Sequence, residues 1–189
     1  MGKAWEHFKT ISYHKYLVAQ GCFQVGLYRQ GILHDLSKYS PLEFMVGARY
    51  YQGNRSPNNA EREAKGYSAA WMHHKGRNRH HFEYWTDYSS DPSKKGSVVP
   101  VPMPDKYIVE MVMDRIAASK VYKGKDYTDS SPLEYYLQGR ARKQIHPQTA
   151  KKLERMLRML AEEGEAKTFA WIRRRLMREK QAAVHRSTC

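Results

Sequence analysis

The sequence predicts an all-α protein, and three observations support this class. Apolar residues recur three and four positions apart along most of the 189 residues, which is the helical period. Alternation of polar and apolar residues, which would indicate strands, does not extend over any useful length. Prolines, glycines and serines lie between the periodic segments, where helices begin and end.

The first half of the chain is expected to form three helices. Gly31 can end the first helix. The second begins with Ser40 as N-cap and Pro41 in the first turn, and both residue types are favourable at those positions. A polar segment separates the second helix from the third. The expected helices cover residues 4–29, 40–51 and 59–78, and the loop covers 52–59.

The second half is expected to return to helices after an irregular loop. That loop, residues 87–104, holds four prolines together with serine, glycine and lysine. Gly164 is expected to break the chain between the last two amphipathic helices. The expected helices cover residues 104–122, 132–139 and 147–163, followed by a final helix that includes 169–176.

The chain is strongly basic, with a formal charge of +14. Residues 140–189 hold 14 Lys or Arg against five Asp or Glu, so most of the excess lies in the last quarter. Such charge favours anionic partners, above all a phosphate backbone, although a solvated helix face is the plainer interpretation. We expect a domain over residues 1–164 and a basic C-terminal helix or tail over 165–189.

The composition excludes several other classes of protein. Cys22 and Cys189 are the only cysteines, which rules out a disulfide framework and suits a reducing cytosol. No segment approaches the roughly 20 apolar residues that a membrane helix needs. We therefore expect a cytoplasmic protein without a membrane partner, and the sequence leaves its oligomeric state open.

The histidines form a pattern together with two aspartates. Taken singly, each has an ordinary explanation, such as a hydrogen-bonded core histidine or an aspartate paired with an arginine. Asp114 shares a helix face with apolar residues, where a carboxylate is costly to bury unless it is paired or binds a metal. Together they follow the order of ligands in the HD superfamily of metal-dependent phosphohydrolases. The residues in order are His14, His34, Asp35, His73, His74, His80, His81 and Asp114.

Neutral imidazoles and carboxylates together bind divalent Mn, Fe, Co or Zn. Adjacent His34 and Asp35 can reach one metal only where a helix starts or is distorted, and His14 and Asp114 would complete this first shell from two other helices. His74 and His81 would bind a second metal from one face of a continuous helix. Two metals would hold both the attacking and the leaving oxygen of a phosphoester.

Two cations are expected to contact the substrate phosphate. Lys38 lies one turn after His34, where it could neutralise a phosphoryl oxygen, although a solvated lysine is an equally good interpretation. Arg77 would share the next helix face with His73 and His80 and could reach the same phosphate. The expected catalytic residues are therefore Lys38, Asp35 and Arg77.

The chain resembles a small family of bacteria and phages that is catalogued as a domain of unknown function and commonly linked to the HD fold. The family usually has Trp after the aspartate of the fourth helix, where this chain has Arg115. The residues beyond about 164 fall outside the resemblance. The resemblance rests on His14-Lys15 and on residues 34–44 (HDLSKYSPLEF), 70–85 (AWMHHKGRNRHHFEYW), 103–115 (MPDKYIVEMVMDR) and 145–157 (IHPQTAKKLERML).

The resemblance implies an HD-like helical bundle that holds one or two divalent ions, of Mn, Fe, Co, Zn or Mg. It implies a first metal site at His14, His34, Asp35 and Asp114, with His74 and His81 as ligands for a second. The segment HDLSK is similar to the HD-x-G-K segment of cyclic-dinucleotide phosphodiesterases, which supports a role for Lys38.

The expected function is hydrolysis of a phosphoester through metal-activated water. The substrate would be a nucleotide, a cyclic nucleotide or a nucleic acid, so the expected partner is a phosphorylated small molecule or a nucleic acid. Two alternatives stay open. Some HD proteins are di-iron oxygenases with the same ligand order, and the positive charge would also suit a nucleic-acid-binding protein with a structural metal site.

Overall fold

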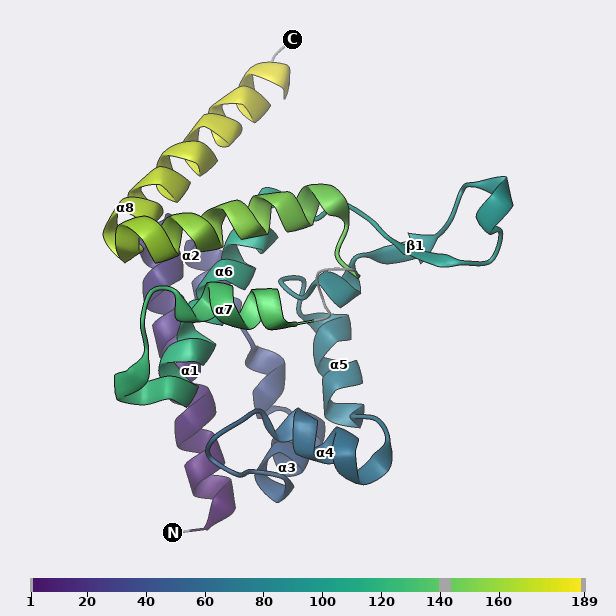
Figure 1. Cartoon of the computed structure of the whole chain (residues 1–189), viewed down its shortest axis with the longest axis vertical. Coiled ribbons are helices and arrows are strands. Elements are labelled where there is room, and N and C mark those ends of the chain that lie inside the picture. Colours follow the sequence, from purple (N-terminus) through teal and green to yellow (C-terminus); the bar gives the residue numbers. More distant parts are fainter. Residues whose placement is uncertain (1, 140–143, 188–189) are drawn as a thin grey trace.

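The computed structural model describes residues 2–139 and 144–187, without the side chains of residues 179–180 and 183–187. The predicted segment 165–189 therefore extends beyond the described residues. The described chain is mostly helical, as expected (Figure 1). Its helices, 3₁₀ turns (η) and strands are, in order, α1 (Lys3–Gln24), α2 (Tyr28–Leu33), η1 (Leu36–Tyr39), α3 (Pro41–Arg49), α4 (Pro57–Lys65), α5 (Ala69–Arg77), η2 (Phe82–Tyr84), β1 (Thr86–Tyr88), η3 (Pro92–Lys94), β2 (Val98–Pro100), α6 (Asp105–Lys123), η4 (Gly124–Asp126), α7 (Ser131–Gln138) and α8 (Pro147–Ser187).

Helices α1 and α6 pack against each other at the centre of the bundle. Gly21 permits their close approach, because a Cβ atom there would lie 2.7 Å from Met113 Sδ. Val18 and Val112 are fully buried in the core around this contact, and each such burial contributes about 1.5–3 kcal/mol. The packed pair is a firm support for polar side chains that α1 and α6 carry elsewhere along their lengths.

Helix α8 packs on α6 and bends sharply at Gly164 (Figure 1). Gly164 has φ 79° and ψ 172°, a conformation that glycine adopts far more readily than other residues, and the predicted break is confirmed. Leu157 before the bend and Ile172 after it are both buried in the main core. The two halves of α8 therefore meet at a corner that is fixed by packing on both sides.

The single helix expected over residues 4–29 is two helices. Gly26 has φ 81°, and its amide donates to the carbonyl of Phe23, so the chain leaves the helical path there. Helix α2 then includes Gly31, which was expected to end the first helix. This break matters because α2 ends at Leu33, directly before His34.

The single helix expected over residues 59–78 is also two helices. Gly66, with φ 80°, ends α4, and Ser68 caps α5 by accepting a hydrogen bond from the Trp71 amide at 3.0 Å. Helix α5 ends at Arg77, so the expected helical face through His81 does not form. A turn carries the chain from Asn78 to His81 instead.

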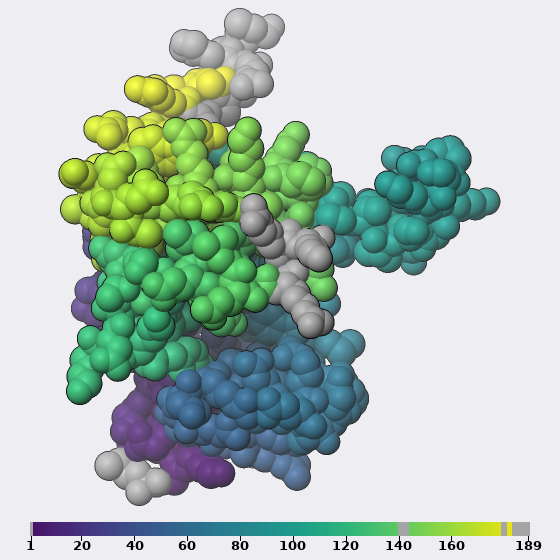
Figure 2. Space-filling view, in the orientation of Figure 1, coloured from purple at the N-terminus to yellow at the C-terminus, as the bar shows by residue number. Residues whose placement is uncertain are grey.

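The loop expected at residues 87–104 contains most of a short hairpin that the sequence did not indicate. Strands β1 and β2 are antiparallel, and Asp87 pairs with Val99 at the centre of the register. The hairpin projects from the helical body (Figures 1 and 2). Strands of three exposed or half-buried residues show no alternation that a sequence pattern could reveal. Among the described residues, none of the helices combines the length and apolar content needed to cross a membrane.

Candidate metal centre

The chain turns sharply at His34 and Asp35. His34 leaves α2 with φ −51° and ψ 127°, and Asp35 is left-handed at φ 53°, the one positive φ outside glycine in the described residues. Aspartate tolerates this conformation better than most residues. Lys15 holds the turn by donating from Nζ to the carbonyls of Ile32 and His34, at 2.5 and 2.8 Å. Two consecutive side chains therefore reach one place, as expected for a distorted helix end.

Four side chains from α1, the His34–Asp35 turn and α6 form a first group of metal-ligand atoms. His14 Nε2 lies 3.0 Å from Asp114 Oδ1 and 3.7 Å from Asp35 Oδ2. His34 Nε2 lies 3.3 Å from Asp35 Oδ2 and 3.6 Å from Asp114 Oδ1. Ligands about 2.1 Å from one ion lie ~3.0 Å apart in an octahedron and ~3.4 Å apart in a tetrahedron. The group therefore has the dimensions of one coordination shell.

A second group forms around the other oxygen of Asp35. Asp35 Oδ1 lies 3.3 Å from His74 Nε2 and 3.4 Å from His80 Nε2. The ring of His81 lies 4.0 Å from that of His80 and 4.8 Å from that of His74, centre to centre. One ligand atom from each of these four residues lies within 4.8 Å of the others. Asp35 thus joins the two groups, which we call together the histidine cluster: His14, His34, Asp35, His74, His80, His81 and Asp114.

Two further carboxylates orient the rings. Glu110 Oε1 accepts hydrogen bonds from Nδ1 of His34 and of His80, at 3.0 and 3.2 Å. Glu43 accepts from Nδ1 of His74 at 2.8 Å and of His73 at 2.6 Å. Because an ionised carboxylate only accepts, each of these Nδ1 atoms carries a proton, and the Nε2 atoms of His34, His74 and His80 face Asp35.

Several buried atoms at the centre of the cluster have no well-aligned hydrogen-bond partner in the described part of the chain, although charged groups lie close to some of them. Both oxygens of Asp35 are among them, each with less than 1 Å² exposed. So are the Nε2 atoms of His14, His34, His80 and His81. These are the atoms that divalent cations would bind, so the residues fit a metal site once Lys38 releases Asp35 and His34 gives up a proton.

The carboxylates of the cluster are held in their ionised form. Burial alone would raise the pKa of Asp35, but the positive charges of His34 and Lys38 hold it well below its usual range. Burial opposes ionisation of Asp114 as well, but hydrogen bonds with His14 and His34 lower its pKa well below the ordinary value. Both groups are therefore negatively charged at neutral pH, which is the form that binds cations.

The imidazoles differ in their protonation. Burial and the charge of Lys38 lower the pKa of His14, and burial with the charges of His80 and His74 lowers that of His81. Burial would also lower the pKa of His34, but the charge of Asp35 and hydrogen bonds to Asp114 raise it well above the usual value. His14 and His81 are thus neutral, the form that can bind a metal, whereas a metal would displace a proton from His34.

Lys38 lies beside the cluster, whereas Arg77 lies apart from it. The Nζ atom of Lys38 is 2.6 Å from Asp35 Oδ2, and this side chain is 28% exposed. Arg77 is exposed at the last residue of α5 and makes no hydrogen bond or ion pair with the cluster among the described residues. The expectation that His80 shares a face with Arg77 is wrong, because α5 has ended and the following turn directs His80 to Asp35.

Sequence reasoning did not assign His80 to the second metal, and it missed Glu110 and Glu43 as carboxylates that orient the rings. Glu110 lies one helical turn before Asp114, so its spacing was a signal that could have found it. Asn78, the residue after α5, donates to Ser37 Oγ and to the His74 carbonyl, both at 2.8 Å. Asn78 therefore ties the end of α5 to the segment that follows Asp35.

Comparisons with known proteins give a family but no activity. No match was found among curated proteins or among solved structures. One family model matches residues 3–159, which include every residue of the histidine cluster, and nothing in the match links that family to the HD superfamily. Because the match spans most of the chain, the protein belongs to DUF5662, a family of unknown function.

Proposed function

We propose that the protein is a metal-dependent phosphohydrolase with an HD-like helical core. Its substrate would be the phosphoester of a nucleotide, a cyclic nucleotide or a nucleic acid. The observation that carries the proposal is the position of Asp35, whose Oδ2 faces His14 and His34 while its Oδ1 faces His74 and His80. A carboxylate shared in this way suits two cations held a few ångströms apart.

The charge and the donor atoms favour a pair of divalent ions. Four carboxylates lie in or directly around the cluster, namely Asp35, Glu43, Glu110 and Asp114, and two divalent ions would balance their charge. Imidazole nitrogens favour Mn, Fe, Co or Zn over Mg, which prefers oxygen ligands. When bound, two such ions supply a nucleophile from water at neutral pH and neutralise phosphoryl charge.

Lys38 would bind a phosphoryl oxygen of the substrate. Its ammonium now pairs with Asp35, and its partial exposure places it between the buried cluster and solvent. Cations on Asp35 would weaken that pairing and leave the ammonium available to an anionic ligand. Arg77, exposed at the end of α5, is the second proposed phosphate contact. Glu110 and Glu43 would keep the imidazoles aligned during turnover.

Hydrolysis of bis-p-nitrophenyl phosphate tests this function. We expect turnover to require added Mn, Fe, Co or Zn and to stop when the ion is chelated. His34→Ala should abolish turnover while the circular dichroism of the protein is retained. His146→Ala is the matched control, because it removes an imidazole whose Nδ1 only accepts from the Gln148 amide. Undiminished hydrolysis by metal-free protein or by His34→Ala would contradict the proposal. Oxygen uptake by iron-loaded protein without phosphoester cleavage would favour the oxygenase alternative.

A further inference from the structure

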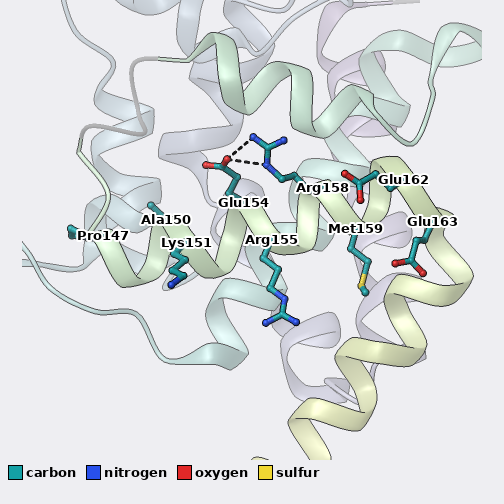
Figure 3. Close-up of a pocket in the computed structure, with 9 residues that line it drawn as sticks. All are labelled: Pro147, Ala150, Lys151, Glu154, Arg155, Arg158, Met159, Glu162 and Glu163. Atoms are coloured by element: carbon teal, nitrogen blue, oxygen red, sulfur yellow. Dashed lines mark hydrogen bonds and ion pairs between the residues drawn. The ribbon is translucent and has the colours of Figure 1, made fainter.

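Two hollows lie along α8, and they differ in charge. Figure 3 shows the first, which is lined by residues 147–163 of α8, before the bend. Arg158 there donates to Glu154 at 2.8 and 3.0 Å, so its charge is already paired. The charged side chains that line it balance: Lys151, Arg155 and Arg158 against Glu154, Glu162 and Glu163. This hollow therefore has no excess of either sign.

The second hollow, which we call the α8 hollow, has a volume of about 280 Å³ between the start of α6 and both halves of α8. Its floor is apolar and includes Met156, Ile172 and Leu176, which are all buried. Its charged lining is one-sided: Lys151, Lys152, Arg155 and Arg175 against Asp105. A concave apolar floor under a cationic rim is suited to a small ligand that carries both a flat apolar part and an anion.

Trp171 provides the flat surface of this hollow. The guanidinium carbon of Arg155 lies 4.9 Å from the indole ring centre, and that of Arg175 lies 5.8 Å from it. Indole rings and guanidinium planes are both surfaces on which unpaired nucleic-acid bases stack. The hollow therefore combines a stacking surface with cations that can reach the adjoining phosphate.

The cations are neutralised only in part. Asp105 forms ion pairs with Lys152 and with Arg175, the latter at 3.2 Å. Lys151 and Arg155 are exposed and form no ion pair with a carboxylate in the described part of the chain. Arg155 is held by its contact with Trp171, which is worth about 0.5–1 kcal/mol at an exposed site, so it can turn toward a phosphate at little cost.

We propose that the α8 hollow binds one unpaired nucleotide of a single-stranded nucleic acid, with the base against Trp171 and the phosphate on Lys151 and Arg155. A base in a duplex could not enter a concave hollow, which favours a single strand. Exposed Arg174 and Arg178, one turn apart on the same helix, extend the cationic surface beyond the hollow. The inference is independent of the proposed hydrolase, because none of these residues belongs to the histidine cluster.

Fluorescence anisotropy with a short labelled oligouridylate, in chelator and at physiological salt, tests the site. The double variant Lys151→Ala/Arg155→Ala should weaken binding at least roughly tenfold. The matched variant Arg158→Ala/Lys167→Ala removes the same charge outside the hollow and should weaken binding less than about twofold. Trp171→Leu keeps an apolar side chain but removes the stacking surface, and should weaken binding roughly fivefold or more. Circular dichroism checks that each variant is folded.

Three results would overturn the proposal. The first is an equal loss of oligonucleotide affinity in the two double variants, and the second is equally tight binding of a duplex of the same length. The third is displacement of the labelled oligonucleotide by UMP at the same concentration as by unlabelled oligouridylate. The last would identify a site for free nucleotides instead of a strand. His34→Ala should bind the oligonucleotide as the natural protein does. Loss of hydrolysis with retained strand binding, or the reverse, therefore separates failure of one proposal from failure of the other.

Discussion

The histidine cluster and the α8 hollow are opposite in charge and in burial. The cluster brings carboxylates together in the interior, and Asp35 is 1% exposed. The α8 hollow brings cations together at the surface, with Lys151 and Arg155 open to solvent. Both include residues of α6, since Asp105 begins this helix and Asp114 follows nine residues later, about 13 Å along the axis. One helix thus contributes residues to the proposed metal site and to the proposed strand-binding site.

The difference shows why the net charge of the chain is a poor guide to its chemistry. A charge of +14 suggests anionic partners everywhere, yet the deeply buried carboxylate of Asp35 lies in a site proposed for cations. Surface cations attract anions over a distance set by the ionic strength, whereas buried carboxylates act only on what enters the site. The following experiments separate the two regions, from the largest expected effect to the smallest.

Asp35→Asn should remove both ions, because Asp35 is the one side chain that both ligand groups share. We expect hydrolysis to fall by at least roughly 10³-fold, since loss of both ions removes the nucleophile and the charge stabilisation together. Elemental analysis and initial rates measure the two effects. Asp114→Asn, which alters only the first group, should retain one ion. Two ions retained by Asp35→Asn would show that the groups do not share this carboxylate.

Chelation should lower the free energy of unfolding. An ion present at a thousandfold excess over its Kd stabilises the folded state by about 4 kcal/mol. Removing the ions would remove this stabilisation and leave the buried atoms of the cluster without a bound cation. Urea titration with and without chelator measures the change. Asp35→Asn serves as the control, because it should show little response. A chelator effect of equal size in both proteins would place the stabilising ion elsewhere.

Glu110→Gln and Glu43→Gln should weaken ion binding in different ways. Glu110 orients His34 of the first group and His80 of the second, so its loss should lower the affinity for both ions by roughly 10–100-fold. Glu43 orients only His74 within the cluster, so its loss should affect one ion. Calorimetric titration with Zn²⁺ or Mn²⁺ resolves the two affinities. An identical pattern for both variants would mean that these carboxylates do not act through the individual rings.

His7 should make the stability of the metal-free protein depend on pH. Burial and the charge of Lys38 lower the pKa of His7 from 6.5 to about 4. Between these values the unfolded chain binds the proton and the folded chain does not, so stability falls as the pH falls through this window. After allowance for solvent screening, we expect His7→Gln to remove about 2 kcal/mol of that dependence. Urea midpoints of the natural protein and of His7→Gln at pH 7 and pH 4.5 measure this difference. Equal changes in the midpoints of the two proteins between these pH values would contradict the prediction.

The sequence revealed the first ligand group more fully than the second. His14, His34, Asp35 and Asp114 meet as expected, because the sequence correctly required a helix end at His34. His80 could not be placed, because its position depends on where α5 ends. The end of α5 depends in turn on the Asn78 side chain and its tertiary contact with Ser37. A prediction from periodicity alone extends a helix until it reaches a proline or a glycine.

The rest of the fold shows the same limit. Gly164 broke α8 where expected, because its conformation is a local property of the backbone. The breaks at Gly26 and Gly66 were missed, although they too are glycines, because glycine also occurs inside helices, as Gly31 does in α2. Glu43 has no local signature at all, and Glu110 has only its spacing of one helical turn before Asp114. Their role arises only when distant imidazoles pack beside them and require an acceptor.

The metal content of the protein tests the central claim most directly. Elemental mass spectrometry of protein purified without chelator should find two equivalents of Mn, Fe, Co or Zn per chain, and none in Asp35→Asn purified in the same way. Natural protein that carries no transition metal, and takes up none when the ions are supplied, would contradict the claim that Asp35 joins two metal sites.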